Sequence, residues 1–204
     1  MRNVFAFLLA LTLCPAAQAE SALPGVSAGL SIPEAEPEPQ ATKSVEERLD
    51  TLFSQLKREP NEKAAQRIAG KIWQAWFESG SASIDLMMKW ANDAIEAKNY
   101  PVALDFLDQI VVLEPKFAEG FNRRATVHFM MRDFGKSMAD IERTLQLEPR
   151  HFGALTGLAE IMKGRNSKQL SLDAYQRVLA LYPMLRSAQK EVSDMSEDLT
   201  GERI

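Results

Sequence analysis

A repeat of 34 residues constrains the fold of this chain more than any other feature of its sequence. Pro115, Pro149 and Pro183 are spaced 34 residues apart. Aligned on these prolines, the chain divides into three consecutive units, 84–117, 118–151 and 152–185. Self-similarity at a period of this length is typical of arrays in which each unit is one small supersecondary structure that stacks on the next.

Further columns of the three units match, and they predict a helical hairpin. The eighth and twentieth residues of each unit are small, and the fourth is large: Ala91, Ala125 and Ala159; Ala103, Ser137 and Ser171; Met87, Phe121 and Leu155. Small side chains let two antiparallel helices approach closely, and the larger residue fills the space beside them. Proline at the thirty-second position has no N–H and disfavours helical geometry in the residue before it, so it is expected to end the second helix.

The segments on either side of the repeats also have helical patterns. Ser44 and Glu47 form a capping box at the start of a helix, and Asn61 is a plausible N-cap for the next one. We therefore expect residues 44–80 to form a divergent helical hairpin that caps the array. Residues 186–204 carry one apolar stripe and are expected to form a solvating last helix, as repeat arrays require. No stretch alternates with period two for long enough to form a strand, so the predicted fold class is all-α.

The first 43 residues are predicted to be a signal peptide followed by a linker. Arg2, the apolar run over 4–13 and the Ala17-Gln18-Ala19 cleavage pattern indicate a signal peptide over 1–19. The run is too short to span a bilayer, which needs about 20 residues. We therefore expect a secreted, periplasmic chain with no integral membrane span. Residues 20–43 are rich in Pro and Glu and are expected to be a disordered linker.

Composition and motifs argue against most catalytic and metal-dependent functions. The net charge of −4 offers no bulk attraction for nucleic acid, and one Cys with two His exclude a multi-cysteine zinc site and a disulfide framework. No phosphate-binding loop or nucleophile motif is present, so we predict no enzyme activity, no cofactor and no metal. His128 is expected to pack in the interior, and His151, in a turn, to be exposed.

The repeat columns resemble the tetratricopeptide repeat (TPR). The resemblance is carried by the small residues at positions eight and twenty, the aromatic residue at seventeen (Tyr100, Phe134) and the proline at thirty-two. The departures are Arg124 where the family usually has Leu, His128 where it often has Tyr, and Lys168 where an aromatic residue is common. The resemblance implies an α-solenoid of three stacked helix hairpins. It extends to small envelope-associated repeat proteins of Gram-negative bacteria, which implies a non-catalytic scaffold role in cell-envelope assembly or integrity.

The resemblance also implies a groove for a protein or peptide partner, lined by the first helix of each unit. The candidate groove residues are Asp85, Met88, Asn92, Glu119, Asn122, Thr126, Phe129, Met130, Thr156, Glu160 and Lys163. This set is mildly acidic with an apolar centre, so the expected ligand is an apolar segment that is neutral or basic. The alternative for the Met residues is simple core filling. Asn122-Arg123-Arg124 with Lys89 could form a carboxylate-binding spot, although ordinary surface charge is the favoured interpretation.

Three rival functions remain open on the sequence. The array could self-associate as a structural protein. Cys14 could carry a lipid anchor for an envelope assembly factor, although the preceding Leu13 is bulkier than a lipidation motif requires. A hydrolase site could lie in the 44–80 hairpin, although no nucleophile–base pair is found there.

Overall fold

The computed structural model describes residues 44–201, and over this range all regular secondary structure is α-helical, as predicted. The predicted signal peptide and linker lie outside the described residues. The described helices are α1 (Val45–Arg58), α2 (Glu62–Phe77), α3 (Ala82–Glu96), α4 (Tyr100–Leu113), α5 (Ala118–Met130), α6 (Phe134–Leu147), α7 (Phe152–Gly164), α8 (Lys168–Leu181) and α9 (Arg186–Gly201). None of these helices is long and apolar enough to cross a membrane.

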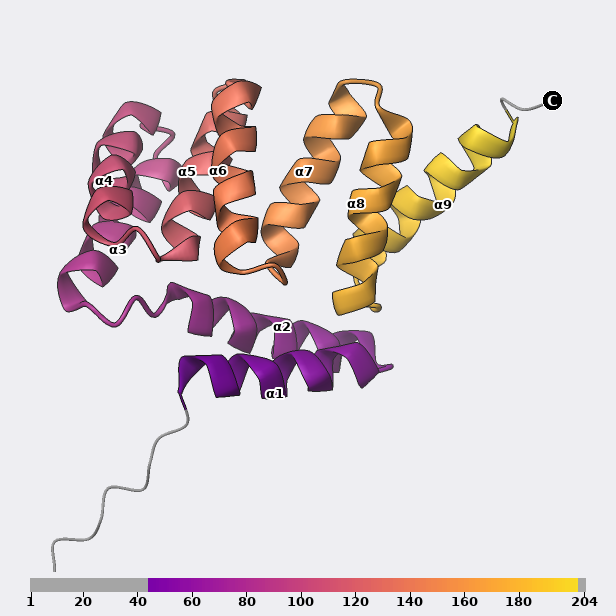
Figure 1. Ribbon diagram of the computed structural model, residues 1–204, viewed down its shortest axis with the longest axis horizontal. Coiled ribbons are helices and arrows are strands. Elements are labelled where there is room, and N and C mark those ends of the chain that lie inside the picture. Colours follow the sequence, from indigo (N-terminus) through magenta and orange to yellow (C-terminus); the bar gives the residue numbers. More distant parts are fainter. Residues whose placement is uncertain (1–43, 202–204) are drawn as a thin grey trace, which may run out of the picture. The chain divides into compact units, whose positions relative to one another are not determined.

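Helices α3 to α8 form three hairpins that repeat the same local geometry (Figure 1). Within each unit a small residue at position twenty meets the helix carrying position eight. The Ser137 hydroxyl donates to the Ala125 carbonyl at 2.9 Å, and the Ser171 hydroxyl donates to the Ala159 carbonyl at 2.8 Å. The close approach expected from these columns is therefore present, and the two serines satisfy their buried hydroxyls across it.

The turn inside each hairpin has a feature that the column analysis did not predict. Lys98, Arg132 and Asn166 all adopt positive φ angles, of 57°, 63° and 59°. They are spaced 34 residues apart, like the prolines. A residue in this left-handed conformation after a helix allows the following N–H groups to bond back to the last free carbonyls. Such positions usually hold Gly. Because Lys, Arg and Asn occupy them here, no glycine in the sequence indicated the turn.

The α1–α2 hairpin forms as predicted but does not stack in line before the first repeat. Figure 1 shows it running crosswise below the repeat helices. Phe53 and Trp76 of the hairpin share one hydrophobic core with Phe152 and Tyr182, which belong to the third repeat. The hairpin therefore covers α7, α8 and α9 rather than the outer side of α3 and α4.

A glycine makes this placement possible. An ideal Cβ built on Gly153 would lie 2.5 Å from the ring of Trp73, closer than real Cβ contacts allow. The ring of Trp73 therefore occupies the space that any other residue at 153 would fill. At the other end, Ala188 and Met195 of α9 are buried against the same core, so the last helix covers the final repeat.

Candidate functional site

A recess between α5 and α7 brings together part of the predicted groove. Its volume is about 150 Å³. The lining residues that belong to the predicted set are Asn122, Thr126, Phe129, Thr156 and Glu160. Ala125, Ser137, Ile141, Gly153, Ala154 and Gly157 complete the wall.

Helical spacing and small side chains create this recess. Asn122, Thr126 and Phe129 lie one turn apart on one face of α5. Opposite them, α7 presents Gly157, where an added Cβ would already be 3.4 Å from Ile141. The Thr126 hydroxyl donates to the Asn122 carbonyl at 2.9 Å, as expected for Thr inside a helix. Its methyl group and the Phe129 ring make the wall mainly apolar, while hydroxyl oxygens remain able to accept hydrogen bonds.

Glu160 supplies the only charged side chain among the residues that line the recess. Its carboxylate accepts a hydrogen bond from the Tyr175 hydroxyl of α8. Burial, and then this hydrogen bond, raise the pKa of Tyr175 far above its ordinary value. The tyrosine therefore stays protonated and holds the carboxylate in place. One turn further along α7, Lys163 pairs with Glu191 of α9 at 2.5 Å, so its charge is directed away from the recess.

The remaining predicted groove residues are placed differently. Met88 is only 2% exposed and packs in the core of the first repeat, so core filling is the correct interpretation for this methionine. Asp85 is exposed but accepts hydrogen bonds from Ser79 at the turn before α3. Asn92 is half-buried and Met130 is exposed at the end of α5, and neither lines the recess.

Glu119, also predicted for the groove, instead lies in a buried polar cluster. Its side chain is fully buried, as is that of His151, and their Oε2 and Nε2 atoms are 3.0 Å apart. His151 Nδ1 accepts the Ala154 N–H at 3.1 Å, so the ring proton is on Nε2 and is donated to Glu119. The Trp76 ring stacks on the imidazole at a centroid distance of 4.0 Å. The expectation that His151 is exposed was therefore wrong, because this side chain caps α7 and is covered by Trp76 of the α1–α2 hairpin.

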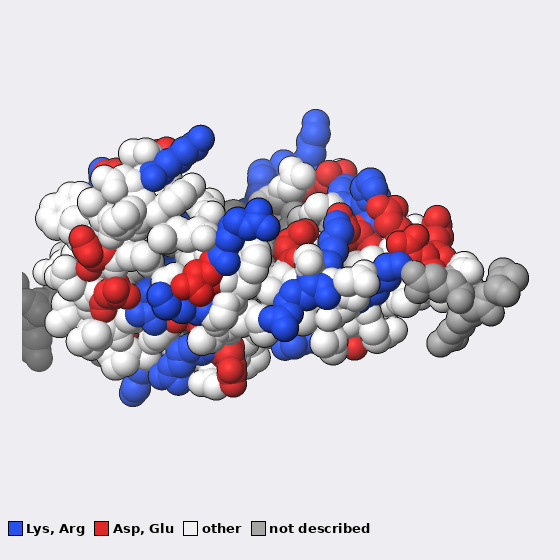
Figure 2. Space-filling view, turned by 90° about the horizontal axis from the view of Figure 1, so that it is seen from above, with Lys and Arg blue, Asp and Glu red and all other residues white. Residues whose placement is uncertain are grey.

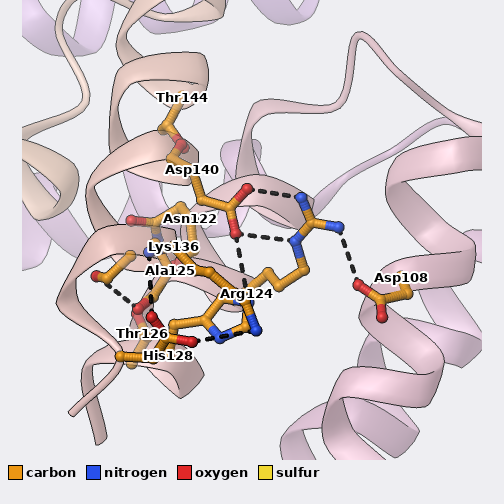
Figure 3. Close-up of polar contacts among 11 residues, drawn as sticks. Asp108, Asn122, Arg124, Ala125, Thr126, His128, Lys136, Asp140 and Thr144 are labelled. Carbon is orange, nitrogen blue, oxygen red and sulfur yellow. Dashed lines mark hydrogen bonds and ion pairs between the residues drawn. The ribbon is translucent and has the colours of Figure 1, made fainter. Parts of the chain in front are cut away.

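The Asn122-Arg123-Arg124 run does not form an open basic spot. Arg124 lies between the first two repeats: its Nε and Nη2 atoms bind both carboxylate oxygens of Asp140 at 2.8 and 2.6 Å, and Nη1 binds Asp108 of α4 at 2.9 Å (Figure 3). Arg123 pairs with Glu119 at 2.9 Å. Lys89 pairs with Asp93 at 2.8 Å. Each of these cations is thus paired within the chain. Ordinary surface charge describes Lys89, which is exposed, whereas Arg123 and Arg124 bind buried carboxylates, which that interpretation did not predict.

His128 packs beside this network, as expected for its column. Its Nε2 lies 4.0 Å from an Asp140 oxygen, and the side chain is nearly buried. Burial lowers the pKa of His128 below its ordinary value, and the nearby Asp140 carboxylate opposes this shift only in part. Among residues 44–201, no group of three or more His, Cys, Asp or Glu side chains is placed to hold a metal ion.

Comparison with solved structures shows the same fold in several repeat domains. The first TPR domain of RPAP3 bound to the HSP90 peptide SRMEEVD superposes with a TM-score of 0.54 at 19% identity, covering 57% of this chain and 93% of that domain. The Sgt2 TPR domain of Aspergillus fumigatus superposes with a TM-score of 0.55 at 15% identity, covering 60% of this chain and 83% of that one. At these identities the likeness establishes the fold alone.

Sequence comparison identifies the family. No family model matches the chain. A TPR repeat-containing protein of Rhizobium etli is 51% identical over 163 residues, which is 80% of each chain. A small glutamine-rich tetratricopeptide repeat-containing protein of Saccharomyces cerevisiae is 24% identical over 102 residues, half of this chain and 29% of that one. The repeat columns, the stacked hairpins and the Rhizobium relative together place this chain in the tetratricopeptide-repeat family.

Proposed function

We propose that this protein is a non-catalytic adaptor that binds a segment of another protein in the recess between α5 and α7. The observation that carries the proposal is the recess itself, which gathers five of the predicted groove residues on two preformed helices. A preformed site loses little conformational entropy on binding. Structural relatives support it, since one is bound to an HSP90 peptide and another, the TPR2B domain of yeast Sti1, is in a complex with an Hsp70 peptide.

The chemistry of the recess defines the segment. Phe129 and the Thr126 methyl group favour an apolar side chain, and Glu160 favours a neutral or basic neighbour. The HSP90 peptide SRMEEVD has three acidic residues near its end. No Lys or Arg lines the recess here. An acidic tail would therefore meet only Glu160, and we expect this protein to reject it.

The cellular setting belongs to the same proposal. We place the adaptor in the periplasm, serving cell-envelope assembly or integrity, on the basis of the signal-peptide pattern over 1–19. Mass spectrometry of the protein purified from its host tests this step. A first residue of Glu20 is expected. A lipid-modified Cys14 would support the membrane-anchored alternative, and an uncleaved chain would contradict both.

Peptide selection against the full mature chain tests the binding site. Peptides from a random library are expected to be apolar and basic. Thr126→Arg, which places a bulky cation in the recess, should weaken their binding at least tenfold. Gln55→Arg adds the same group on the exposed side of α1 and should leave binding unchanged. Selected peptides that are acidic, or that bind Thr126→Arg as well as the parent, would refute the assignment.

A further inference from the structure

The three repeats show which side of a hairpin contacts the preceding repeat. In the second repeat this side includes Gly120, where an ideal Cβ would lie 2.9 Å from Ile110 of α4, and Arg124, which binds Asp108 of α4. In the third repeat the corresponding residues are Ala154 and Leu158, which pack with Ile141 and Leu145 of α6. The third and seventh positions of a unit therefore form its stacking face.

In the first repeat this stacking face is apolar and open. The residues at the third and seventh positions are Leu86 and Trp90, which are 45% and 44% exposed. Phe106 of α4 packs beside Trp90 with a centroid distance of 5.5 Å, and Val102 and Leu113 extend the patch along α4. No helix among residues 44–201 covers it, because the α1–α2 hairpin packs on the third repeat instead. Figure 2 shows mostly uncharged surface at the end formed by α3 and α4.

We propose that this face binds the same face of a second copy of the chain, giving a two-fold symmetric dimer. The face is shaped to receive a pair of helices, because its equivalents in the other repeats do so. In repeat proteins that stay monomeric, the terminal repeats normally present a polar outer face. Here α9 provides such a side at one end, and the apolar face of α3 and α4 lies at the other. An isologous dimer buries both copies of this face with one contact.

The charges beside the patch favour a second copy over an unrelated partner. Lys89 and Asp93 lie two residues on either side of position 91 on α3, and within one copy they pair with each other at 2.8 Å on the exposed side of the helix. When two α3 helices cross antiparallel near that position, Lys89 of each copy also comes opposite Asp93 of the other, so the two intrahelical pairs can join into one four-charge network. This pattern is self-complementary. The acidic 20–43 segment of the same chain, with Glu34, Glu36 and Glu38, would gain no such charge match.

The size of the face predicts a weak dimer. Helices α3 and α4 have 15 and 14 residues, so each is roughly 20 Å long, and together they offer a footprint of roughly 400 Å². Stable complexes commonly bury about 800 Å² per partner. We therefore expect a Kd on the order of 10 µM, well above the nanomolar range.

Sedimentation of the full mature chain from about 1 µM to about 300 µM tests the proposal over the range where such a dimer forms. The parent should convert from monomer to dimer. Leu86→Glu should shift the transition at least tenfold, whereas Leu170→Glu, at an exposed leucine of α8, should not shift it. Trp90 is exposed, so the tryptophan emission of the parent should move to shorter wavelength with the same midpoint.

A charge exchange tests the symmetric geometry. Lys89→Asp alone should weaken the dimer several-fold, and adding Asp93→Lys should restore it. Far-ultraviolet circular dichroism of each variant at about 1 µM, where the monomer dominates, reports whether the fold is intact. A parent that stays monomeric throughout, or a dimer that Leu86→Glu leaves unchanged, would overturn the proposal.

Discussion

The ion pair between Arg124 and Asp140 offers the sharpest test of how the repeats are held together. Arg124 occupies a column where the family usually has Leu, so Arg124→Leu restores an ordinary packing residue. The Asp140 side chain, however, is only 7% exposed and has Arg124 as its bidentate partner. Removing the arginine leaves a carboxylate in the interior, with only the His128 imidazole, whose pKa burial lowers, 4.0 Å away. The more family-like residue should therefore be the less stable one.

The expected loss of stability in each variant follows from the burial of Arg124 and Asp140. Breaking a buried ion pair by removing one member costs about 3–5 kcal/mol. Because Arg124 itself is 21% exposed, some water reaches the pair, and we expect Arg124→Leu to cost about 2–3 kcal/mol. Asp140→Ala should cost about 1–2 kcal/mol, since Arg124 keeps Asp108 and partial access to water. The double variant leaves no unpaired buried charge and should lie within about 1 kcal/mol of the parent.

Urea unfolding of the four proteins at neutral pH measures these differences. The expected signature is a coupling free energy of about 3 kcal/mol between the two positions, because the effects of residues in direct contact are not additive. Arg143→Leu on α6, whose guanidinium is bound by the Pro115 carbonyl and not by a buried carboxylate, serves as the control and should cost less than Arg124→Leu. Strictly additive effects, or an Arg124→Leu variant as stable as the parent, would refute the reasoning.

Three further predictions concern stability. Because burial lowers the pKa of His128 in the folded state, the unfolded chain binds a proton at this histidine first as the pH falls below about 6.5. The free energy of unfolding should therefore decrease there, by at most about 1.4 kcal/mol per pH unit. His128→Phe should flatten this slope in urea titrations at several pH values. Gly153→Ala collides with the Trp73 ring and should cost about 1–3 kcal/mol, whereas Gly70→Ala, with open space around it in α2, should stabilise by about 0.5–1 kcal/mol; thermal unfolding separates them. Glu119→Ala removes a carboxylate that accepts three hydrogen bonds in the interior and should lower the urea-unfolding free energy by about 3 kcal/mol.

The repeat could be predicted because its signals are local and recur. Position eight meets position twenty inside one hairpin, and the proline ends the same hairpin, so each unit repeats the evidence of the others. The recess was partly predictable for the same reason: Thr126 and Phe129 lie on one helix face, and helical spacing alone brings them together. Met88 was misplaced because the same spacing does not tell whether a neighbouring helix covers that face.

Contacts between distant parts of the chain carried no such signal. His151 stands in a turn, where exposure is the usual outcome, and only the folded chain brings Trp76 and Glu119 onto it. The position of the α1–α2 hairpin depends on Gly153, a residue far along the chain that leaves room for Trp73. A glycine in a helix predicts a close approach of some kind, but it does not name the ring that fills the space.

The crosswise hairpin changes how this array is stabilised. In an open solenoid each repeat contacts only its neighbours, so stability is a sum of local terms. Here Asp50 of α1 pairs with Arg150 before α7, and Glu62 of α2 pairs with Arg186 of α9. These contacts connect segments 100 and 124 residues apart. The third repeat is thus covered by both ends of the described chain, so unfolding of either end exposes the same core, and the two ends are coupled. The α1–α2 hairpin does not cover the first repeat in this way. Its helices α3 and α4 are also the pair whose apolar face we propose to bind a second copy of the chain.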